Sequence, residues 1–200
     1  MKITKVKTFL CNCFRTNWVF VKIETDSGIH GWGEATLEYK EPTVVAAIHD
    51  LEYYLIGSDP GNIEKFRHDC YRDAYWRGGQ VLMSALAGVE TALWDIKGKA
   101  LGVPVYELFG GKVRDAVPIY VNGWFAPAKT PDEFAEKALE VRRNRFLGCK
   151  WDPFGKAWQE IGKRELNSAM ECVRKVSEAV GDDVLLLIEG HGRFNIPTAV

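Results

Sequence analysis

The 200-residue sequence lacks several features that define whole classes of protein. Its most continuous apolar run, residues 184–188, is far shorter than the roughly 20 residues that a membrane-spanning helix needs. Lysines interrupt the first ten residues, so we expect neither a secretion signal nor a membrane anchor in them. Basic residues occur at most in pairs, and the formal net charge is -1. We therefore expect no nucleic-acid partner and no membrane partner.

Cysteine is sparse as well. The five cysteines are an odd number at irregular positions, and the closest two, Cys11 and Cys13, do not have the Cys-x-x-Cys spacing. This pattern predicts free thiols in a reducing compartment. Because no targeting segment is evident, the expected location is the cytoplasm.

The first half of the chain predicts an α+β unit over residues 1–114. Three strand-like runs, rich in Val, Ile, Phe and Thr, are followed by three segments with a helical apolar period. A hairpin turn is expected at Asp26-Ser27-Gly28. The predicted strands cover residues 1–10, 18–26 and 29–35, and the predicted helices begin at Pro42, begin at Asp59-Pro60, and span 82–101 with Gly102 as the stop.

A glycine pair in the third strand-like run, Gly31-Trp32-Gly33, matches only the start of a dinucleotide-binding fingerprint. No third glycine follows at the required spacing, and the pair lies on the return strand of a hairpin rather than at a strand-to-helix turn. We therefore interpret these glycines as structural.

After residue 114 strands and helices alternate, which predicts the first three βα units of a parallel barrel or doubly wound sheet over residues 115–200. The continuous apolar character of residues 184–188 indicates a strand of a parallel sheet that is covered on both faces. The predicted strands are 117–121, 147–151 and 184–188; the helices begin at the capping box Thr130-Pro131-Asp132-Glu133, span 164–180 before Gly181, and begin at Ile196-Pro197.

Four polar residues follow two of these strands. Glu189 and His191 are two residues apart at the end of the third strand, and Lys150 and Asp152 repeat that spacing on the second. Because alternate residues of a strand share a face, all four should lie near one rim. Together they could bind a divalent metal and move a proton beside a carbonyl. Structural ion pairs also occupy such rims, and Lys150 with Asp152 could form a simple salt bridge.

Three segments carry a resemblance to a known family. Residues 84–111, SALAGVETALWDIKGKALGVPVYELFGG, resemble the third-helix signature of the enolase superfamily, mandelate racemase subgroup. Residues 31–34, Gly-Trp-Gly-Glu, resemble the hairpin of its capping domain. Residues 189–193, Glu-Gly-His-Gly-Arg, resemble the Asp-x-His-Gly-Arg motif of its sugar-acid dehydratases, particularly those of galactonate and gluconate. The similarity covers essentially the whole chain.

The resemblance implies a capping domain and a modified (β/α)8 TIM-type barrel, of which this chain carries the N-terminal part. It implies Mg²⁺ held by carboxylates at the ends of the third, fourth and fifth strands, with Glu189 as the first ligand. A base would remove the α-proton of a sugar acid, and His191 would protonate the departing 3-hydroxyl to give a 2-keto-3-deoxy acid. The base and the other two ligands would lie beyond Val200. A homo-oligomer is expected, as is common among relatives.

The chain departs from the family pattern at two positions. The racemases of the family carry Lys-x-Lys on the second strand, whereas this chain has Lys150-Trp151-Asp152. The missing second lysine favours a one-base dehydratase, in which Lys150 pairs with the substrate carboxylate and Asp152 binds a substrate hydroxyl or the lysine. Glu189 replaces the commoner Asp and is still a hard oxygen ligand for Mg²⁺.

Three further residues are predicted to bind substrate: Arg193, Asn122 and Arg15. Asn122 follows the first barrel strand, and Arg15 lies in a loop, residues 11–17, where relatives carry a specificity loop. Two alternatives to the dehydratase remain open. One is a racemase or epimerase of the same superfamily, and the other is a noncatalytic metabolite-binding protein or a fragment kept by pairing with another chain.

Overall fold

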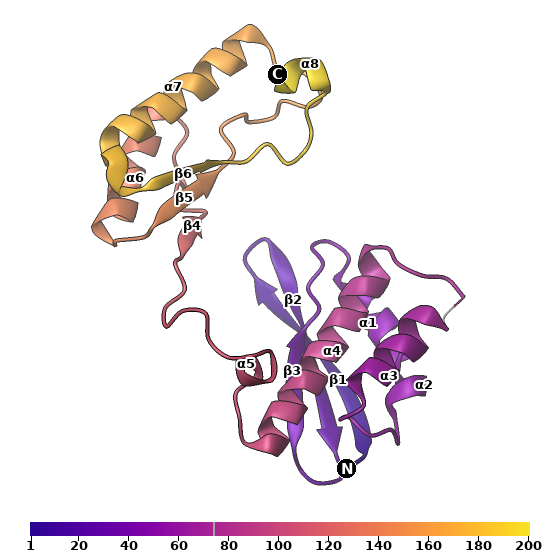
Figure 1. The fold of residues 1–200 in the computed structure, drawn as a ribbon. Helices are drawn as coiled ribbons and strands as arrows, with labels where there is room; N and C mark the ends of the chain where they lie inside the picture. The colour runs from indigo at the N-terminus through magenta and orange to yellow at the C-terminus, as the bar shows by residue number, and fades with distance from the viewer. Residues whose placement is uncertain (74) are drawn as a thin grey trace. The chain divides into compact units, whose positions relative to one another are not determined.

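The computed structural model describes residues 1–73 and 75–200. They form two compact units, Met1–Val113 and Arg114–Val200, shown in Figure 1. Each unit has its own sheet, its own helices and its own cluster of buried apolar side chains. Among the described helices, none is long and apolar enough to cross a membrane.

The N-terminal unit contains an antiparallel sheet of β1 (Ile3–Cys13), β2 (Thr16–Thr25) and β3 (His30–Glu34). The predicted hairpin between the second and third strands is confirmed. The predicted loop over residues 11–17 is wrong, because the strand pairing continues through Cys11 with Trp18 and through Cys13 with Thr16. Only two residues remain for the turn, so this connection is a tight hairpin rather than a long loop.

The helices of this unit differ from the prediction at their boundaries. Their bounds are α1 (Glu41–Asp50), α2 (Glu52–Leu55), α3 (Ile63–Arg67), the π-helix η1 (His68–Arg72), α4 (Gln80–Leu101) and α5 (Val105–Leu108). The predicted start at Asp59-Pro60 is wrong. Asp59 Oδ1 accepts the backbone N–H of Gly61 at 2.9 Å, so the aspartate stabilises a turn, and the helix begins only at Ile63. The predicted third helix and its stop at Gly102, which has a left-handed backbone, are confirmed.

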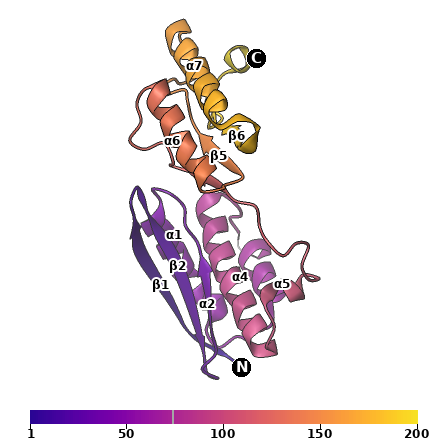
Figure 2. The ribbon, with the colours of Figure 1, turned by 90° about the vertical axis from the view of Figure 1, so that its left-hand side faces the viewer.

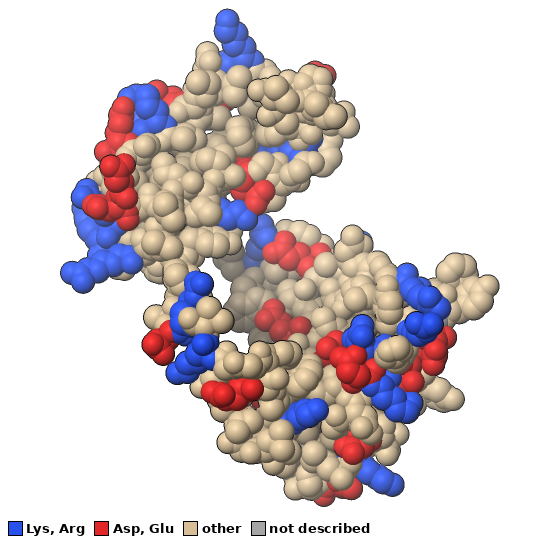
Figure 3. Space-filling view, in the orientation of Figure 1, with Lys and Arg blue, Asp and Glu red and all other residues tan. Residues whose placement is uncertain are grey.

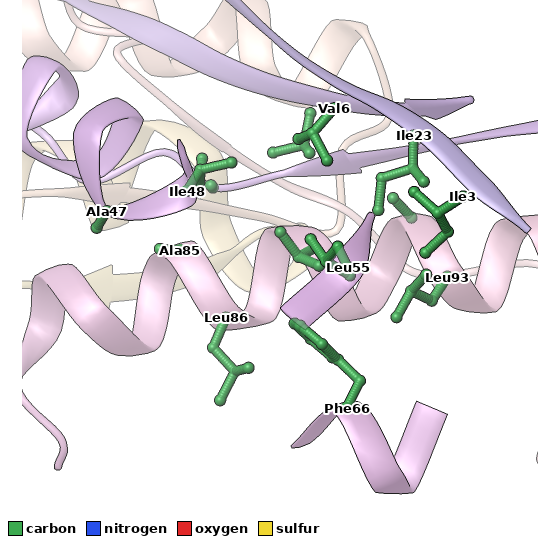
Figure 4. Packing of buried hydrophobic residues seen from close by; sticks show 14 of the residues in the cluster. Ile3, Val6, Ile23, Ala47, Ile48, Leu55, Phe66, Ala85, Leu86 and Leu93 are labelled. Carbon is green, nitrogen blue, oxygen red and sulfur yellow. The ribbon is translucent and has the colours of Figure 1, made fainter. Parts of the chain in front are cut away.

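Helix α4 lies along one face of the sheet in both ribbon views (Figures 1 and 2). The two glycines of β3 permit this contact. A Cβ atom on Gly31 would lie 2.0 Å from the carbonyl oxygen of Ala92, and one on Gly33 would lie 1.9 Å from that of Gly88. The structural interpretation of the glycine pair is therefore confirmed. Figure 4 shows the adjacent core, where Ile3, Val6 and Ile23 of the strands face Leu55, Phe66 and Leu93 of the helices.

The C-terminal unit contains a parallel sheet in the order β4 (Tyr120–Asn122), β5 (Gly148–Trp151) and β6 (Leu185–Ile188). The predicted capping box at the start of α6 (Pro131–Arg143) is confirmed, with Thr130 and Glu133 bonded in both directions. The prediction of a first strand over residues 117–121 is wrong at its beginning, since the pairing starts at Tyr120. The remaining elements are α7 (Lys163–Val180), the short 3-10 helix η2 (Gly181–Asp183) and α8 (Ile196–Ala199).

The sheet of this unit is covered on one face within the described residues. Side chains of α6 and α7, including Ala138 and Val176, pack against Cys149 and Trp151 of β5. The prediction that residues 184–188 are covered on both faces is wrong for this chain, because Leu185, on the face opposite the helices, is 57% exposed. The observed fold class is therefore a mixed α/β chain with an N-terminal sheet-and-helix unit and a three-stranded parallel sheet.

Candidate active site

The strands β5 and β6 bring the predicted polar residues to one end of the parallel sheet. Lys150 is in register with Leu187, and the ladder continues with a bond from Glu189 N to Trp151 O at 2.9 Å. Because alternate residues share a face, Asp152 and Glu189 follow Lys150 and Leu187 on the same side of the sheet. This face is the one opposite the packed helices, since Cys149 and Trp151 point toward the helices.

Lys150 and Glu189 form an ion pair across the two strands. Lys150 Nζ lies 2.5 Å from Glu189 Oε2, and the other carboxylate oxygen accepts the backbone N–H of His191 at 2.8 Å. The hydrogen bond from Lys150, followed by that from His191 N, lowers the pKa of Glu189 to about 2. The same bond to Glu189 raises the pKa of Lys150 above its ordinary value. Both groups are therefore charged at neutral pH.

A second polar group joins Asp152, His191 and Arg193. Asp152 Oδ2 lies 2.8 Å from His191 Nδ1, and Arg193 Nη2 donates to both oxygens of Asp152 at 2.5 Å. The backbone N–H of Phe154 also donates to Asp152 Oδ1 at 2.9 Å. Asp152 is thus held from three sides, and its carboxylate orients the imidazole ring. A carboxylate can only accept hydrogen bonds, so Nδ1 carries the proton in this contact and Nε2 is the nitrogen left for a ligand.

His191 has a backbone conformation that strand alternation does not predict. Strand β6 ends at Ile188, and His191 has a φ of 53° in the left-handed region. Its side chain is 64% exposed, whereas that of Asp152 is 19% exposed. The imidazole therefore projects into solvent from a partly buried carboxylate support.

Arg193 connects the segments that follow β5 and β6. Its side chain is only 11% exposed, and Nη1 donates to the carbonyl oxygen of Gly155 at 3.2 Å. The segments are also joined by an edge-on contact of the Phe154 and Phe194 rings, 5.0 Å between centroids, and by a bond from Asn195 N to Gln159 O at 2.9 Å. These contacts rigidify the support beneath Asp152 and His191.

The structure brings together five of the seven predicted site residues: Lys150, Asp152, Glu189, His191 and Arg193. Lys150 pairs with Glu189 rather than with Asp152, so the suggested salt bridge within the second strand does not occur among the described residues. Asn122 is in register with Lys150, but its side-chain oxygen accepts the N–H of Gly123. Arg15 lies in the N-terminal unit, where its guanidinium pairs with Glu38.

The sequence reasoning missed the contact between Arg193 and Asp152. A usable signal was present, since residues of opposite charge follow two neighbouring parallel strands, whose carboxyl ends meet at one edge of the sheet. The supporting groups Phe154 N and Gly155 O are backbone atoms and leave no signal in residue type.

The fit of a metal ion depends on Glu189. Its ionised carboxylate is a hard oxygen donor of the kind that Mg²⁺ prefers. The carboxylate of Asp152 is already bonded to Arg193 and His191. In residues 1–73 and 75–200, no group of three or more His, Cys, Asp or Glu side chains could hold a metal ion. The described residues thus provide one fitting ligand and not a complete site.

Comparison with known proteins places the chain in a family through its N-terminal unit. Residues 4–110 match the family described as mandelate racemase/muconate lactonizing enzyme, N-terminal domain. This match covers more than half of the chain. The chain belongs to the mandelate racemase/muconate lactonizing enzyme family. The predicted membership of the enolase superfamily is confirmed.

Individual relatives of this mandelate racemase-type chain include dehydratases. It is 42% identical to D-galactonate dehydratase of Pectobacterium atrosepticum, over 100% of this chain and 50% of that protein, and 41% identical to D-galactonate dehydratase of Ralstonia pickettii over the same shares. A crystal structure described as a dehydratase from Mesorhizobium loti is 38% identical, with a TM-score of 0.92, over 97% of this chain and 54% of that one. The chain spans about half the length of the curated relatives it matches.

Proposed function

We propose that the protein is a Mg²⁺-dependent dehydratase of an aldonic sugar acid of the galactonate or gluconate type. The observation that carries the proposal is the arrangement at the ends of β5 and β6. There an ionised carboxylate lies beside an ammonium group, and a carboxylate-oriented imidazole is exposed next to them. The similarity to D-galactonate dehydratases extends over the whole chain, and the matched range therefore includes the segments that carry this cluster. We also propose that the parallel sheet β4–β6 is the first part of a (β/α)8 barrel.

Glu189 is the proposed metal ligand. The bound Mg²⁺ would supply positive charge against the substrate carboxylate and against the negative charge that develops when the α-proton leaves. The remaining ligands and the base are proposed to lie in the half of the relatives' length that the chain does not match. Glu189 remains ionised because Lys150 and the N–H of His191 both stabilise its charge.

Lys150 is proposed to bind the substrate carboxylate as a cation. Its pKa is raised by Glu189, so the ammonium group holds its proton and does not act as a base at neutral pH. A racemase that removes protons from both faces of a carbon needs a second base, and Asp152, paired with Arg193 and His191, is not available for that role. Lys150 and Asp152 therefore favour elimination over racemisation.

His191 is proposed to act as the general acid. Asp152 accepts the hydrogen bond of Nδ1 and stabilises the doubly protonated ring, so the imidazolium can deliver its Nε2 proton to the departing 3-hydroxyl and is left as a neutral imidazole with the proton on Nδ1. Arg193 is proposed to act as a positioning residue that holds Asp152, in place of the direct substrate contact expected from the sequence. The product of such an elimination is an enol that tautomerises to a 2-keto-3-deoxy acid.

The test is an incubation of the full-length protein with Mg²⁺ and a panel of aldonic acids, in which 2-keto-3-deoxy acids are detected as semicarbazones. At least one acid should give product. A parallel reaction in D₂O separates the alternatives, because exchange at the α-carbon without elimination would identify a racemase or epimerase. If no acid reacts or exchanges although the protein binds Mg²⁺, the dehydratase proposal is wrong and the noncatalytic alternative is favoured.

The variant His191→Asn tests the assignment of the acid. Because α-proton removal does not require His191 in this mechanism, the variant should keep α-exchange in D₂O and lose elimination by about 10²–10⁴-fold, which is the usual contribution of a general acid. Equal loss of both reactions would show that His191 does not act as the acid of the elimination step.

A further inference from the structure

A pocket in the N-terminal unit is lined by an unusual set of residues. The pocket has a volume of about 220 Å³, and its walls are formed by Arg67, His68, Tyr71, Arg72 and Arg77. Three of these five residues are arginines, and none of the five carries a carboxylate. On the face drawn in Figure 3, many of the Lys and Arg side chains lie beside Asp or Glu. The pocket departs from that pattern.

The arginines of the pocket are only partly neutralised by neighbouring acids. Arg67 donates through Nε to Glu64 Oε2 at 3.0 Å, and its Nη2 lies 3.0 Å from the same oxygen. Within the part of the chain that the structure describes, Arg72 and Arg77 form no ion pair or side-chain hydrogen bond. Asp69, on the same turn, is bonded to Lys65 at 2.5 Å. Positive charges that face one pocket repel each other, and an anion between them removes the repulsion.

The local backbone brings these side chains together. Residues 68–72 form the π-helix η1, in which the bond from Asp73 N to His68 O closes a wider turn than that of an α-helix. The turn supplies His68, Tyr71 and Arg72 to the pocket, while Arg67 and Arg77 come from the segments before and after it. Single π-turns are rare in proteins, and those that occur are frequently found at functional sites. This observation is independent of the charge of the pocket.

We propose that this pocket binds a small, multiply charged oxyanion of the phosphate or phosphomonoester class. The volume is below the roughly 300–1,000 Å³ of pockets for drug-sized ligands, so the ligand is small. Guanidinium groups bind phosphate oxygens through paired N–H donors, and the hydroxyl of Tyr71 adds another donor. Three guanidinium groups, one of them paired with Glu64, match the charge of a dianion better than that of a monocarboxylate. The proposal does not depend on dehydratase activity.

The experiment is isothermal titration calorimetry of the full chain at low ionic strength with inorganic phosphate, with glycerol 3-phosphate and with acetate, a monocarboxylate that is not an aldonic acid. Phosphate or glycerol 3-phosphate should bind saturably with one site per chain, and acetate should bind at least tenfold more weakly. The comparison of the first two distinguishes a free phosphate site from a phosphomonoester site. Added salt should weaken binding, because the attraction is electrostatic. Absence of saturable binding by both phosphates, or equal affinity for acetate, overturns the proposal.

Matched variants locate the site. Arg72→Gln and Arg77→Gln should each lower the affinity at least tenfold, while Arg164→Gln, which removes the same charge from an exposed position of α7, should change it less than twofold. Arg72→Lys and Arg77→Lys keep the charge but lose the paired donors, and they should bind with intermediate affinity. Circular dichroism checks that each variant is folded. Unchanged affinity in the folded double variant of Arg72 and Arg77 would place the anion elsewhere and refute the assignment.

Discussion

Gly33 is the position where one added methyl group should do the most damage to the N-terminal unit. In Gly33→Ala the new Cβ would lie 1.9 Å from the carbonyl oxygen of Gly88 and 3.0 Å from the backbone nitrogen of Ala92. Both atoms belong to the backbone of α4, so no flexible side chain can yield. The helix and β3 must separate by about 1 Å before the oxygen contact is tolerable.

The loss of stability follows from the gap that this separation opens between α4 and the sheet. Val89, Leu93 and Ile96 of α4 are fully buried in the cluster beneath the sheet. A radial gap of about 0.5–1 Å forfeits roughly a quarter to a half of the dispersion attraction between the atoms on its two sides. Overpacking a core typically costs about 1–3 kcal/mol, and a rigid backbone contact belongs at the upper end. We therefore expect the variant to lose about 3 kcal/mol of unfolding free energy, a large part of the roughly 5–15 kcal/mol of a native domain.

Urea denaturation followed by circular dichroism measures this loss. Gly61→Ala is the matched control, because its Cβ would meet only the side chain of Asp59, with the nearest atom at 3.3 Å. The control should change the unfolding free energy by less than about 1 kcal/mol. If Gly33→Ala is as stable as Gly61→Ala, the close approach of α4 and β3 is not the reason for the glycine, and the structural interpretation of the pair fails.

Two further predictions concern the other charged groups. Asp152→Asn should leave the fold intact but lower the proposed dehydration rate at least tenfold, because an amide can either donate to or accept from His191 Nδ1 and so no longer fixes the tautomer of the ring. Steady-state kinetics should show the loss in kcat. A loss confined to KM would contradict the positioning role. Glu41 accepts from Asn17 N at 3.0 Å and from the hydroxyl of Thr16, which lowers its pKa from 4.5 to about 2. The stability from these bonds is therefore present above pH 4.5 and is lost as the pH falls toward 2. The loss of unfolding free energy in Glu41→Gln should be largest at neutral pH and should shrink in acid. Denaturation curves that give the same loss at every pH would contradict this.

Elements with strong local signals were predicted well. The capping box at Thr130 and Glu133 joins groups three residues apart, and the end of α4 needs only a glycine with a left-handed backbone at Gly102. The start at Asp59-Pro60 failed for a reason that is also local, since an aspartate can cap a helix or stabilise a turn with the same side-chain oxygen. Residue type alone does not decide between these two bonds.

The burial of β6 could not be predicted from its composition. Residues 184–188 are continuously apolar, which is typical of a strand covered on both faces, yet helices cover one face within the described residues. The apolar composition of a strand indicates that the strand tends to be buried. The composition does not indicate which segments of the protein cover the strand.

The candidate site divides in the same way. The alternation of side chains along a strand was sufficient to predict that Lys150, Asp152 and Glu189 share one rim, because that periodicity is a property of the extended backbone. The choice of partners was decided by the tertiary structure alone. Parallel pairing sets Lys150 opposite Leu187, so Glu189, two residues further along the chain from Leu187, lies on the same face within reach of the ammonium group. The fold of the following segments brings Arg193 onto Asp152, 41 residues away in the sequence. Hydrogen bonds act only at short range, so partners this distant in the sequence are determined by the packing of the two strands and not by the residues themselves.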